Sequence, residues 1–135
     1  MSADIQTIVV GAGVVGLATA RALALAGHEV IVLEQHDLIG SEISSRNSEV
    51  IHAGLYYTPG SLRATLCVRG KTMMYDFARE NGVDHASITK LLVATSEAQL
   101  PKLKSIAETA LKNGVDDLVP MTGAEARALE PELQC

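Results

Sequence analysis

The 135-residue sequence contains no tryptophan, one phenylalanine and three tyrosines, so aromatic residues make up only 3% of it. It also lacks any run of lysines or arginines, and its formal net charge is −5. Proteins that bind nucleic acid usually carry a basic surface, often with aromatic side chains on which bases stack. The composition therefore argues against a nucleic-acid partner.

The sequence is also poor in cysteine, with only Cys67 and Cys135. Two cysteines are too few for a disulfide framework and suit a reducing compartment. No spacing of His, Cys, Asp or Glu suggests a metal site, so we expect no bound metal. The apolar stretch 8–26 contains three glycines and Arg21 and has no basic start, which argues against a signal peptide or membrane span. We therefore expect a cytoplasmic protein.

The most informative segment is Gly11-Ala12-Gly13-Val14-Val15-Gly16 with its flanking residues. Residues 5–10 form a short apolar run rich in β-branched side chains, which predicts a buried strand. A helix is expected over 14–26, ended by Gly27, followed by an adjacent parallel strand over 29–33. Glu34 ends that strand, eighteen residues after Gly16. This order is typical of a dinucleotide-binding βαβ unit.

Each position of the unit has a separate physical role. Gly11 permits a tight turn, Gly13 lets the backbone approach a pyrophosphate, and Gly16 allows the helix to pack closely on the strand. The first turn of the helix, from Val14, offers free N–H groups and the positive end of the helix dipole to a phosphate. Glu34 can accept hydrogen bonds from a ribose diol, which disfavours NADP. The motif alone does not separate FAD from NAD, and a glycine-rich turn in an alanine-rich helical hairpin is the structural alternative.

Downstream of this unit we expect a long polar loop over 35–60 and then alternating elements. Two pairs of residues are each interpreted as a capping box at the start of a helix: Ser96 with Gln99, and Thr122 with Glu125. The expected elements are helices over 61–81 and 97–112, a strand over 88–95, a short extended piece over 118–121, and a short helix that begins at Thr122 and stops before Pro131.

The polar loop carries a resemblance to a known family. Its residues Ser45-Arg46-Asn47-Ser48 precede Val50-Ile51-His52-Ala53-Gly54-Leu55-Tyr56-Tyr57. Together with the glycine-rich turn, this stretch resembles the FAD-dependent oxidoreductases of the D-amino-acid oxidase and glycerol-3-phosphate dehydrogenase type, and within them the L-2-hydroxyglutarate dehydrogenase/oxidase group. The resemblance covers essentially all 135 residues and includes Pro59-Gly60-Ser61-Leu62, Leu66-Cys67, Arg69-Gly70, the run 90–95 and Leu129-Glu130-Pro131.

The resemblance implies an α/β fold. Residues 1–81 would form the N-terminal part of a doubly wound, Rossmann-like FAD-binding domain, and residues 82–135 the beginning of an α+β substrate domain. Members of the family are much longer, so the remainder of both domains is absent from this chain. We therefore expect a truncated part of a longer enzyme, and activity of the isolated chain is doubtful.

The implied function is that of an FAD-dependent oxidoreductase that oxidises a small 2-hydroxy acid resembling L-2-hydroxyglutarate by hydride transfer to flavin. The electron acceptor stays open between oxygen, a quinone and a carrier. A quinone would bring the enzyme to a membrane surface, for which the sequence gives no support. Three alternatives remain: an FAD-dependent amine or amino-acid oxidase of the same family, an NAD-linked Rossmann dehydrogenase, and an inactive truncated nucleotide-binding fragment.

The loop also supplies candidate site residues. Ser44, Ser45 and Asn47 offer short hydrogen-bonding groups, and Arg46 offers a planar cation with several donors. The resemblance implies that this segment passes along FAD, whereas a solvated serine-rich turn is the structural alternative. The full set of expected cofactor-binding residues is Gly11, Gly13, Val14, Val15, Gly16, Glu34, Gln35, Ser44, Ser45, Arg46, Asn47, Ser48 and His52.

His52 is the expected catalytic residue. By the resemblance it lies next to the isoalloxazine ring, where it could remove the hydroxyl proton of an alcohol or stabilise charge on reduced flavin. A buried, hydrogen-bonded structural histidine is the equally weighted alternative. Glu49, close by, departs from the family pattern, because many members of the family have glycine at this position.

Overall fold

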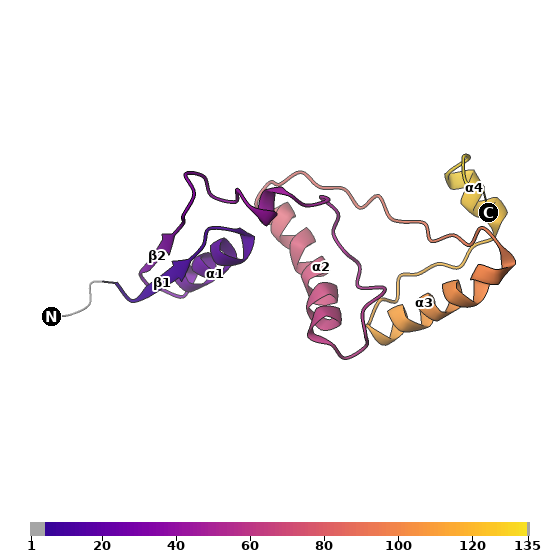
Figure 1. The fold of residues 1–135 in the computed structure, drawn as a ribbon, viewed down its shortest axis with the longest axis horizontal. Coiled ribbons are helices and arrows are strands. Elements are labelled where there is room, and N and C mark those ends of the chain that lie inside the picture. The colour runs from indigo at the N-terminus through magenta and orange to yellow at the C-terminus, as the bar shows by residue number, and fades with distance from the viewer. Residues whose placement is uncertain (1–4, 135) are drawn as a thin grey trace. The chain divides into compact units, whose positions relative to one another are not determined.

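The computed structural model describes residues 5–134 (Figure 1). Residue contacts divide the chain into two compact units, Met1–Val50 and Ile51–Cys135. The predicted domain division between residues 81 and 82 stays a prediction. The elements are β1 (Thr7–Val10), α1 (Val14–Leu25), β2 (Val30–Leu33), α2 (Leu62–Glu80), α3 (Leu100–Lys112) and α4 (Gly123–Leu129), with 3₁₀ turns η1 (Ile43–Ser45) and η2 (Glu97–Gln99).

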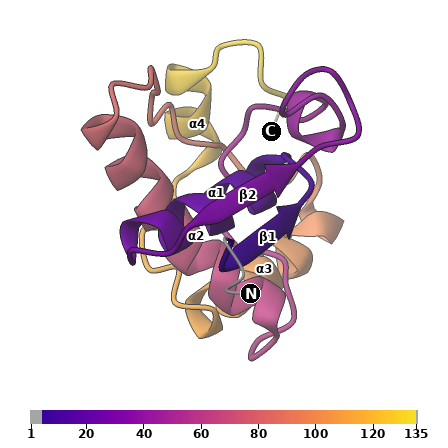
Figure 2. The same ribbon diagram turned by 90° about the vertical axis from the view of Figure 1, so that its left-hand side faces the viewer.

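The first unit contains the predicted βαβ arrangement. Strands β1 and β2 pair in parallel, with Thr7 opposite Val30 and Val10 opposite Leu33, and Figure 2 shows their arrows side by side and pointing the same way. Helix α1 connects the strands and packs against both. Side chains alternate between half-buried and exposed along each strand. The parallel pairing and the connecting helix confirm this part of the predicted fold.

A glycine follows three of the described helices, and the first of them, Gly27, was predicted to end its helix. Gly27 after α1, Gly82 after α2 and Gly114 after α3 all have positive φ angles, of 88°, 65° and 83°. After each glycine, the next backbone N–H donates back to a carbonyl in the last turn of its helix: His28 to Leu23, Val83 to Ala78, and Val115 to Ala110. This is the Schellman arrangement, which satisfies carbonyls that the helix itself leaves unpaired.

The predicted helix starts were right at two positions and wrong at one. Ser61 accepts a hydrogen bond from the Ala64 N–H at the start of α2, and Thr122 with Glu125 forms the predicted capping box at α4. The predicted box at Ser96 is wrong. The Gln99 side chain instead accepts from the Thr95 N–H at 2.8 Å, and α3 begins only at Leu100, after the η2 turn. Proline at the first turn of α3 suits that later start.

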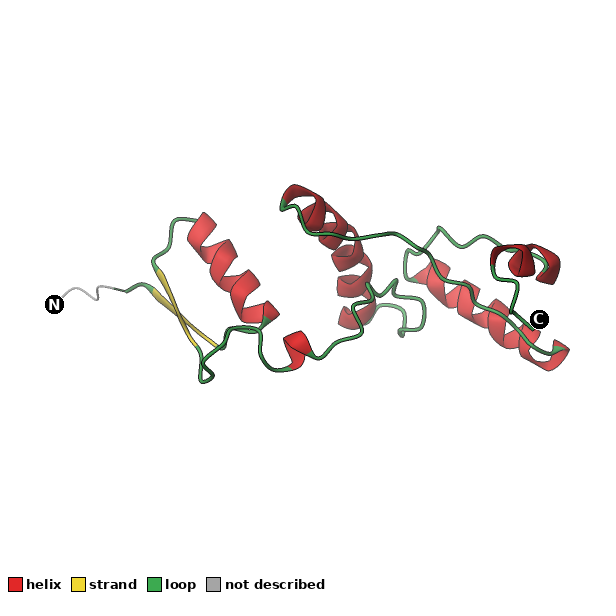
Figure 3. Ribbon diagram, turned by 90° about the horizontal axis from the view of Figure 1, so that it is seen from above, coloured by secondary structure: helices red, strands yellow, loops and turns green. Residues whose placement is uncertain are grey.

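The strand predicted over residues 88–95 is also wrong: this segment has no regular secondary structure, and Figure 3 draws it as loop. The extended piece predicted over 118–121 likewise belongs to no sheet. A strand is defined by hydrogen bonds to a neighbouring strand. Among the described residues, only β1 and β2 form a sheet, so an apolar β-branched run elsewhere has no strand to pair with.

The second unit has a small core. Leu55, Ala110 and Val115 are buried together, and the partly buried side chains of Ala53, Val68, Leu92 and Ile106 pack against them. An ion pair between the Lys71 ammonium and the Asp117 carboxylate, 3.0 Å apart, links α2 to the segment after α3. None of the described helices has the length and apolar character needed to cross a membrane.

Candidate cofactor-binding site

The glycine-rich turn connects β1 to α1, and two of its glycines are needed for different reasons: Gly11 for its backbone conformation and Gly16 for lack of room. The Gly11 N–H donates to the Leu33 carbonyl at 2.7 Å, and Gly11 has a φ of +97°. A Cβ placed on Gly16 would overlap the Gly11 carbonyl oxygen and would lie 3.5 Å from the Val9 side chain. Gly16 therefore permits the close packing of helix and strand that the spacing predicts.

The first turn of α1 receives a side chain from the polar loop. The Ser44 hydroxyl oxygen accepts a hydrogen bond from the Val14 N–H at 2.8 Å, and a Cβ on Gly13 would lie 3.2 Å from the same oxygen. The described residues provide no partner for the Val15 and Gly16 N–H groups. Two donors at the positive end of the helix dipole, with no acidic residue in that turn, favour an anion.

The Glu34 carboxylate is fixed by backbone donors from two segments. Its Oε2 accepts from the Ala12 N–H at 2.7 Å, and its Oε1 accepts from the Gln35 and His36 N–H groups at 2.8 and 3.0 Å. These bonds, that from Ala12 first, lower the pKa of Glu34 below its ordinary value. A carboxylate has about four acceptor positions, so one position on Oε2 is left for a further donor.

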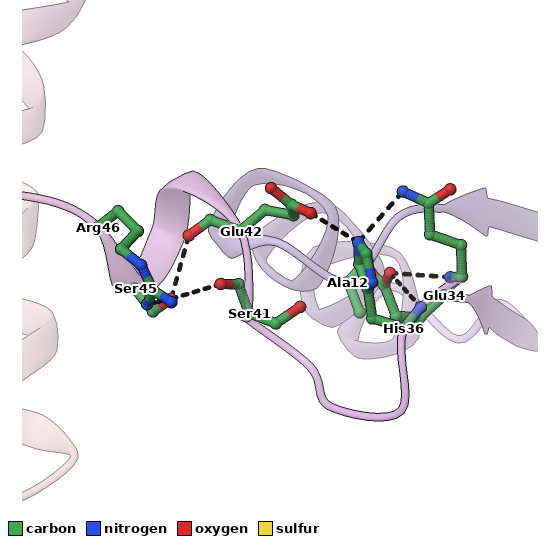
Figure 4. A network of polar contacts seen from close by, with 8 residues as sticks. Ala12, Glu34, His36, Ser41, Glu42, Ser45 and Arg46 are labelled. Atoms are coloured by element: carbon green, nitrogen blue, oxygen red, sulfur yellow. Dashed lines mark hydrogen bonds and ion pairs between the residues drawn. The ribbon is translucent and has the colours of Figure 1, made fainter.

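The backbone of the turn is tied to the same loop. Ala12 is almost completely buried, and its carbonyl accepts from the Gly40 N–H at 2.9 Å. The His36 ring and the Glu42 carboxylate lie 2.7 Å apart, and Figure 4 shows this contact beside Glu34 and Ala12. Ala12 was missed as a site residue, because its N–H bonds to a carboxylate 22 residues away and local spacing does not predict that contact.

The predicted Ser-Arg-Asn segment mainly shapes its own loop. The Ser45 hydroxyl donates to the Ser41 carbonyl at 2.6 Å and accepts from the Arg46 guanidinium at 2.9 Å (Figure 4). The Asn47 amide donates to the Ser44 carbonyl at 2.8 Å and accepts from the Glu49 N–H at 2.7 Å. Of these polar residues, only Ser44 reaches the glycine-rich turn.

None of the hydrogen bonds of this network involves the predicted site residues Ser48 and His52. Ser48 is exposed, and Glu49 has a φ of +56°, a conformation that favours glycine. His52 is exposed and belongs to the second unit, where its carbonyl accepts a hydrogen bond from the Cys67 thiol at 3.3 Å. Its catalytic role stays a prediction. No cluster of His, Cys, Asp or Glu within residues 5–134 could hold a metal ion.

A glycine-rich turn, two N–H groups at the start of a helix that the described residues leave unpaired and a fixed carboxylate suit a dinucleotide, and comparison with known proteins identifies which kind. Residues 6–135 match the family model of FAD-dependent oxidoreductases. The chain belongs to this family. The match confirms the predicted family and FAD as its cofactor, and it excludes the NAD-linked alternative. The Rossmann-like FAD-binding fold is confirmed with it, whereas the start of a substrate domain stays a prediction.

Relatives of known name point to one group within the family. The chain is 47% identical over 131 residues to a protein of Arabidopsis thaliana named mitochondrial L-2-hydroxyglutarate dehydrogenase, and 40% identical over 128 residues to one of that name from Nematostella vectensis. The human protein of the same name is 36% identical over 132 residues. These alignments cover 93–97% of this chain and 27–28% of the relatives, so the chain spans just over a quarter of their length.

The same comparison corrects one prediction. The chain was expected to be cytoplasmic, and this is wrong, because the relatives are named as mitochondrial proteins. The expectation rested on the scarcity of cysteine and on the absence of a recognisable signal. A low cysteine content indicates a reducing compartment, but it does not distinguish one reducing compartment from another.

Proposed function

We propose that residues 11–16, Glu34 and Ser44 bind the ADP part of FAD. The pyrophosphate would lie at the first turn of α1, where the Val15 and Gly16 N–H groups have no partner among the described residues and Gly13 carries no side chain. The ribose would donate a hydroxyl to the remaining acceptor position of Glu34. The fixed Glu34 carboxylate is the observation that supports this proposal best, because backbone donors orient it and lower its pKa, which favours the ionised form.

We further propose that the whole enzyme oxidises a small 2-hydroxy acid, L-2-hydroxyglutarate or a close analogue. The support is the 36–47% identity to dehydrogenases named for that substrate. FAD, when bound, supplies the acceptor for the hydride that leaves the substrate carbon. His52 takes the hydroxyl proton, and Ser45, Arg46, Asn47 and Ser48 line the path of the cofactor. The names of the relatives make the mitochondrion the location that we propose.

The test uses the protein from the longest reading frame that contains this chain. We expect flavin absorbance bands in the purified protein, and bleaching of these bands when L-2-hydroxyglutarate is added without oxygen. Bleaching needs no electron acceptor, so the unknown acceptor does not affect the result. Absence of flavin bands would contradict the FAD site. If the bands persist with L-2-hydroxyglutarate but bleach with an amino acid, the proposed substrate is wrong and the proposed FAD site still stands.

A matched pair of variants tests the role of His52. His52→Asn should slow bleaching by a factor of about 10² or more, the usual contribution of a general base. His28→Asn makes the same change at an exposed histidine between α1 and β2 and should leave the rate unchanged. Equal rates in the two variants would assign His52 a structural role only.

A further inference from the structure

Asn113 connects the end of α3 to the loop that carries His52. Its side-chain amide donates to the Gly54 carbonyl at 3.0 Å and to the Tyr57 carbonyl at 2.8 Å. Both partners are acceptors, so they fix which side of the amide carries the nitrogen. The two bonds span 59 and 56 residues of sequence, and they satisfy two carbonyls of a segment that has no regular secondary structure.

Asn113 is itself held in place by the helix end. Its backbone N–H bonds to the Thr109 and Ala110 carbonyls, and Gly114 follows it in the Schellman arrangement. Val115, the next residue, is buried in the core with Leu55 and Ala110. The amide therefore projects from one of the best-anchored points of the second unit.

The His52 loop is held from α2 as well. The Cys67 thiol donates to the His52 carbonyl at 3.3 Å. A Cβ on Gly54 would lie only 2.8 Å from the Val68 side chain, so the loop backbone packs directly on α2. Contacts from α2 and α3 thus fix the carbonyls of His52, Gly54 and Tyr57, while the side chains of His52 and Tyr56 remain exposed.

We propose that Asn113 is a positioning residue for catalysis, which holds the segment 52–57 so that His52 keeps its place relative to the substrate. This inference rests on the proposed function. A displacement of a catalytic group by about 1 Å can cost up to a hundredfold in rate. A loop without regular structure depends on such side-chain anchors to avoid that displacement.

The structure offers a matched control. Asn81 ends α2 as Asn113 ends α3, and each is followed by a glycine with positive φ. The Asn81 amide donates at 2.8 Å to the Phe77 carbonyl of its own helix and does not reach the His52 loop. Asn→Asp at either position keeps the shape and replaces the donor by an acceptor, so only Asn113→Asp should disturb the loop.

The experiment uses the FAD-loaded enzyme from the longest reading frame. The measured quantity is the rate of anaerobic flavin bleaching at saturating L-2-hydroxyglutarate, divided by the amount of bound flavin. We expect Asn113→Asp to lower this rate about tenfold or more. Asn81→Asp should stay within about twofold of the enzyme without substitutions. A loss of folded protein alone would not change the rate per bound flavin. In a His52→Asn background, Asn113→Asp should have no further effect, because the two residues act through the same step.

Other results would overturn the proposal: an unchanged rate in Asn113→Asp, an equal loss in Asn81→Asp, or a full additional loss in the His52→Asn background. If Asn113→Asp does not fold, Asn113→Ala, which removes the whole amide without adding a charge, decides by the same criteria with Asn81→Ala as its control. If the unchanged enzyme does not bleach, the proposed substrate fails. Amide hydrogen exchange of residues 51–57 then tests whether Asn113 holds this segment. Faster exchange in Asn113→Asp than in Asn81→Asp would support that role, and equal exchange in the two variants would contradict it.

Discussion

The Glu34 carboxylate accepts three backbone hydrogen bonds. Glu34→Gln keeps the size of the side chain but places an amide NH₂ group where the backbone offers only donors. We expect FAD to bind about tenfold more weakly or worse, the usual effect of losing a hydrogen bond to a charged group. Titration of the apoprotein from the longest reading frame with FAD measures this. Glu29→Gln, at an exposed carboxylate before β2, is the control and should bind normally.

The same bonds make the contribution of Glu34 to the free energy of unfolding depend on pH. They lower its pKa in the folded protein below the ordinary value of 4.5. A group with a lowered folded pKa stabilises the fold fully above its unfolded pKa, and this contribution is lost as the pH falls through the folded pKa. The unchanged protein should therefore lose more stability on acidification below pH 4.5 than Glu34→Gln does. Parallel acid unfolding curves for the two proteins would show that the bonds do not contribute.

The residues at the site divide into those that sequence spacing can predict and those that it cannot. Gly11, Gly16 and Glu34 were predictable because a βαβ unit fixes their separations along the chain. The bond from Val14 to Ser44 spans 30 residues and depends on the path of an irregular loop. The Asn113 contacts span still more of the chain. No local pattern encodes such contacts, so they emerge only from the structure.

Helices and strands also differ in how well local sequence predicts them. A helix is completed by bonds within a few residues, so glycine ends and capping residues such as Ser61 and Thr122 could be predicted from local sequence. A strand is completed by a partner that can lie anywhere in the chain. The sequence over 88–95 has the composition of a strand, but the described residues supply no neighbour for it.

Replacing either of two helical glycines, Gly16 in α1 or Gly70 in α2, by alanine should have opposite effects on stability. Ala at Gly16 would overlap the Gly11 carbonyl, whereas Ala at Gly70 in α2 would meet no atom within 4 Å. Overpacking costs about 1–3 kcal/mol, so Gly16→Ala should lower the free energy of unfolding and weaken FAD binding. Gly70→Ala should raise stability by about 1 kcal/mol, because alanine is the better helix former. Denaturant unfolding of both variants measures this.

The opposite signs make this pair decisive. If Gly16→Ala bound FAD as tightly as Gly70→Ala does, close contact between α1 and the turn would not be needed for the cofactor. Stabilisation by both variants would further mean that the turn can move away from the helix without cost.

Beyond the single element, the first unit by itself covers only one side of its sheet, with helix α1. Val9 faces α1, whereas the alternating residues Ile8 and Val10 are 56% and 83% exposed, and Ile31 and Leu33 on β2 are 40% and 50% exposed. Parallel sheets are almost always covered on both faces. The chain spans 27–28% of its relatives, so we infer that other parts of the whole protein cover this second face.

One substitution in two contexts tests that inference. In the 135-residue chain alone, Val10→Ser should change the free energy of unfolding little, because the side chain is already in water, and it should reduce binding of a dye that reports exposed apolar surface. In the protein from the longest reading frame, the same change should cost about 1.5–3 kcal/mol, the value of burying a valine side chain. A small effect in both contexts would mean that the apolar face stays in contact with solvent. A large effect only in the longer protein would show that residues outside this chain complete the cofactor domain around β1 and β2.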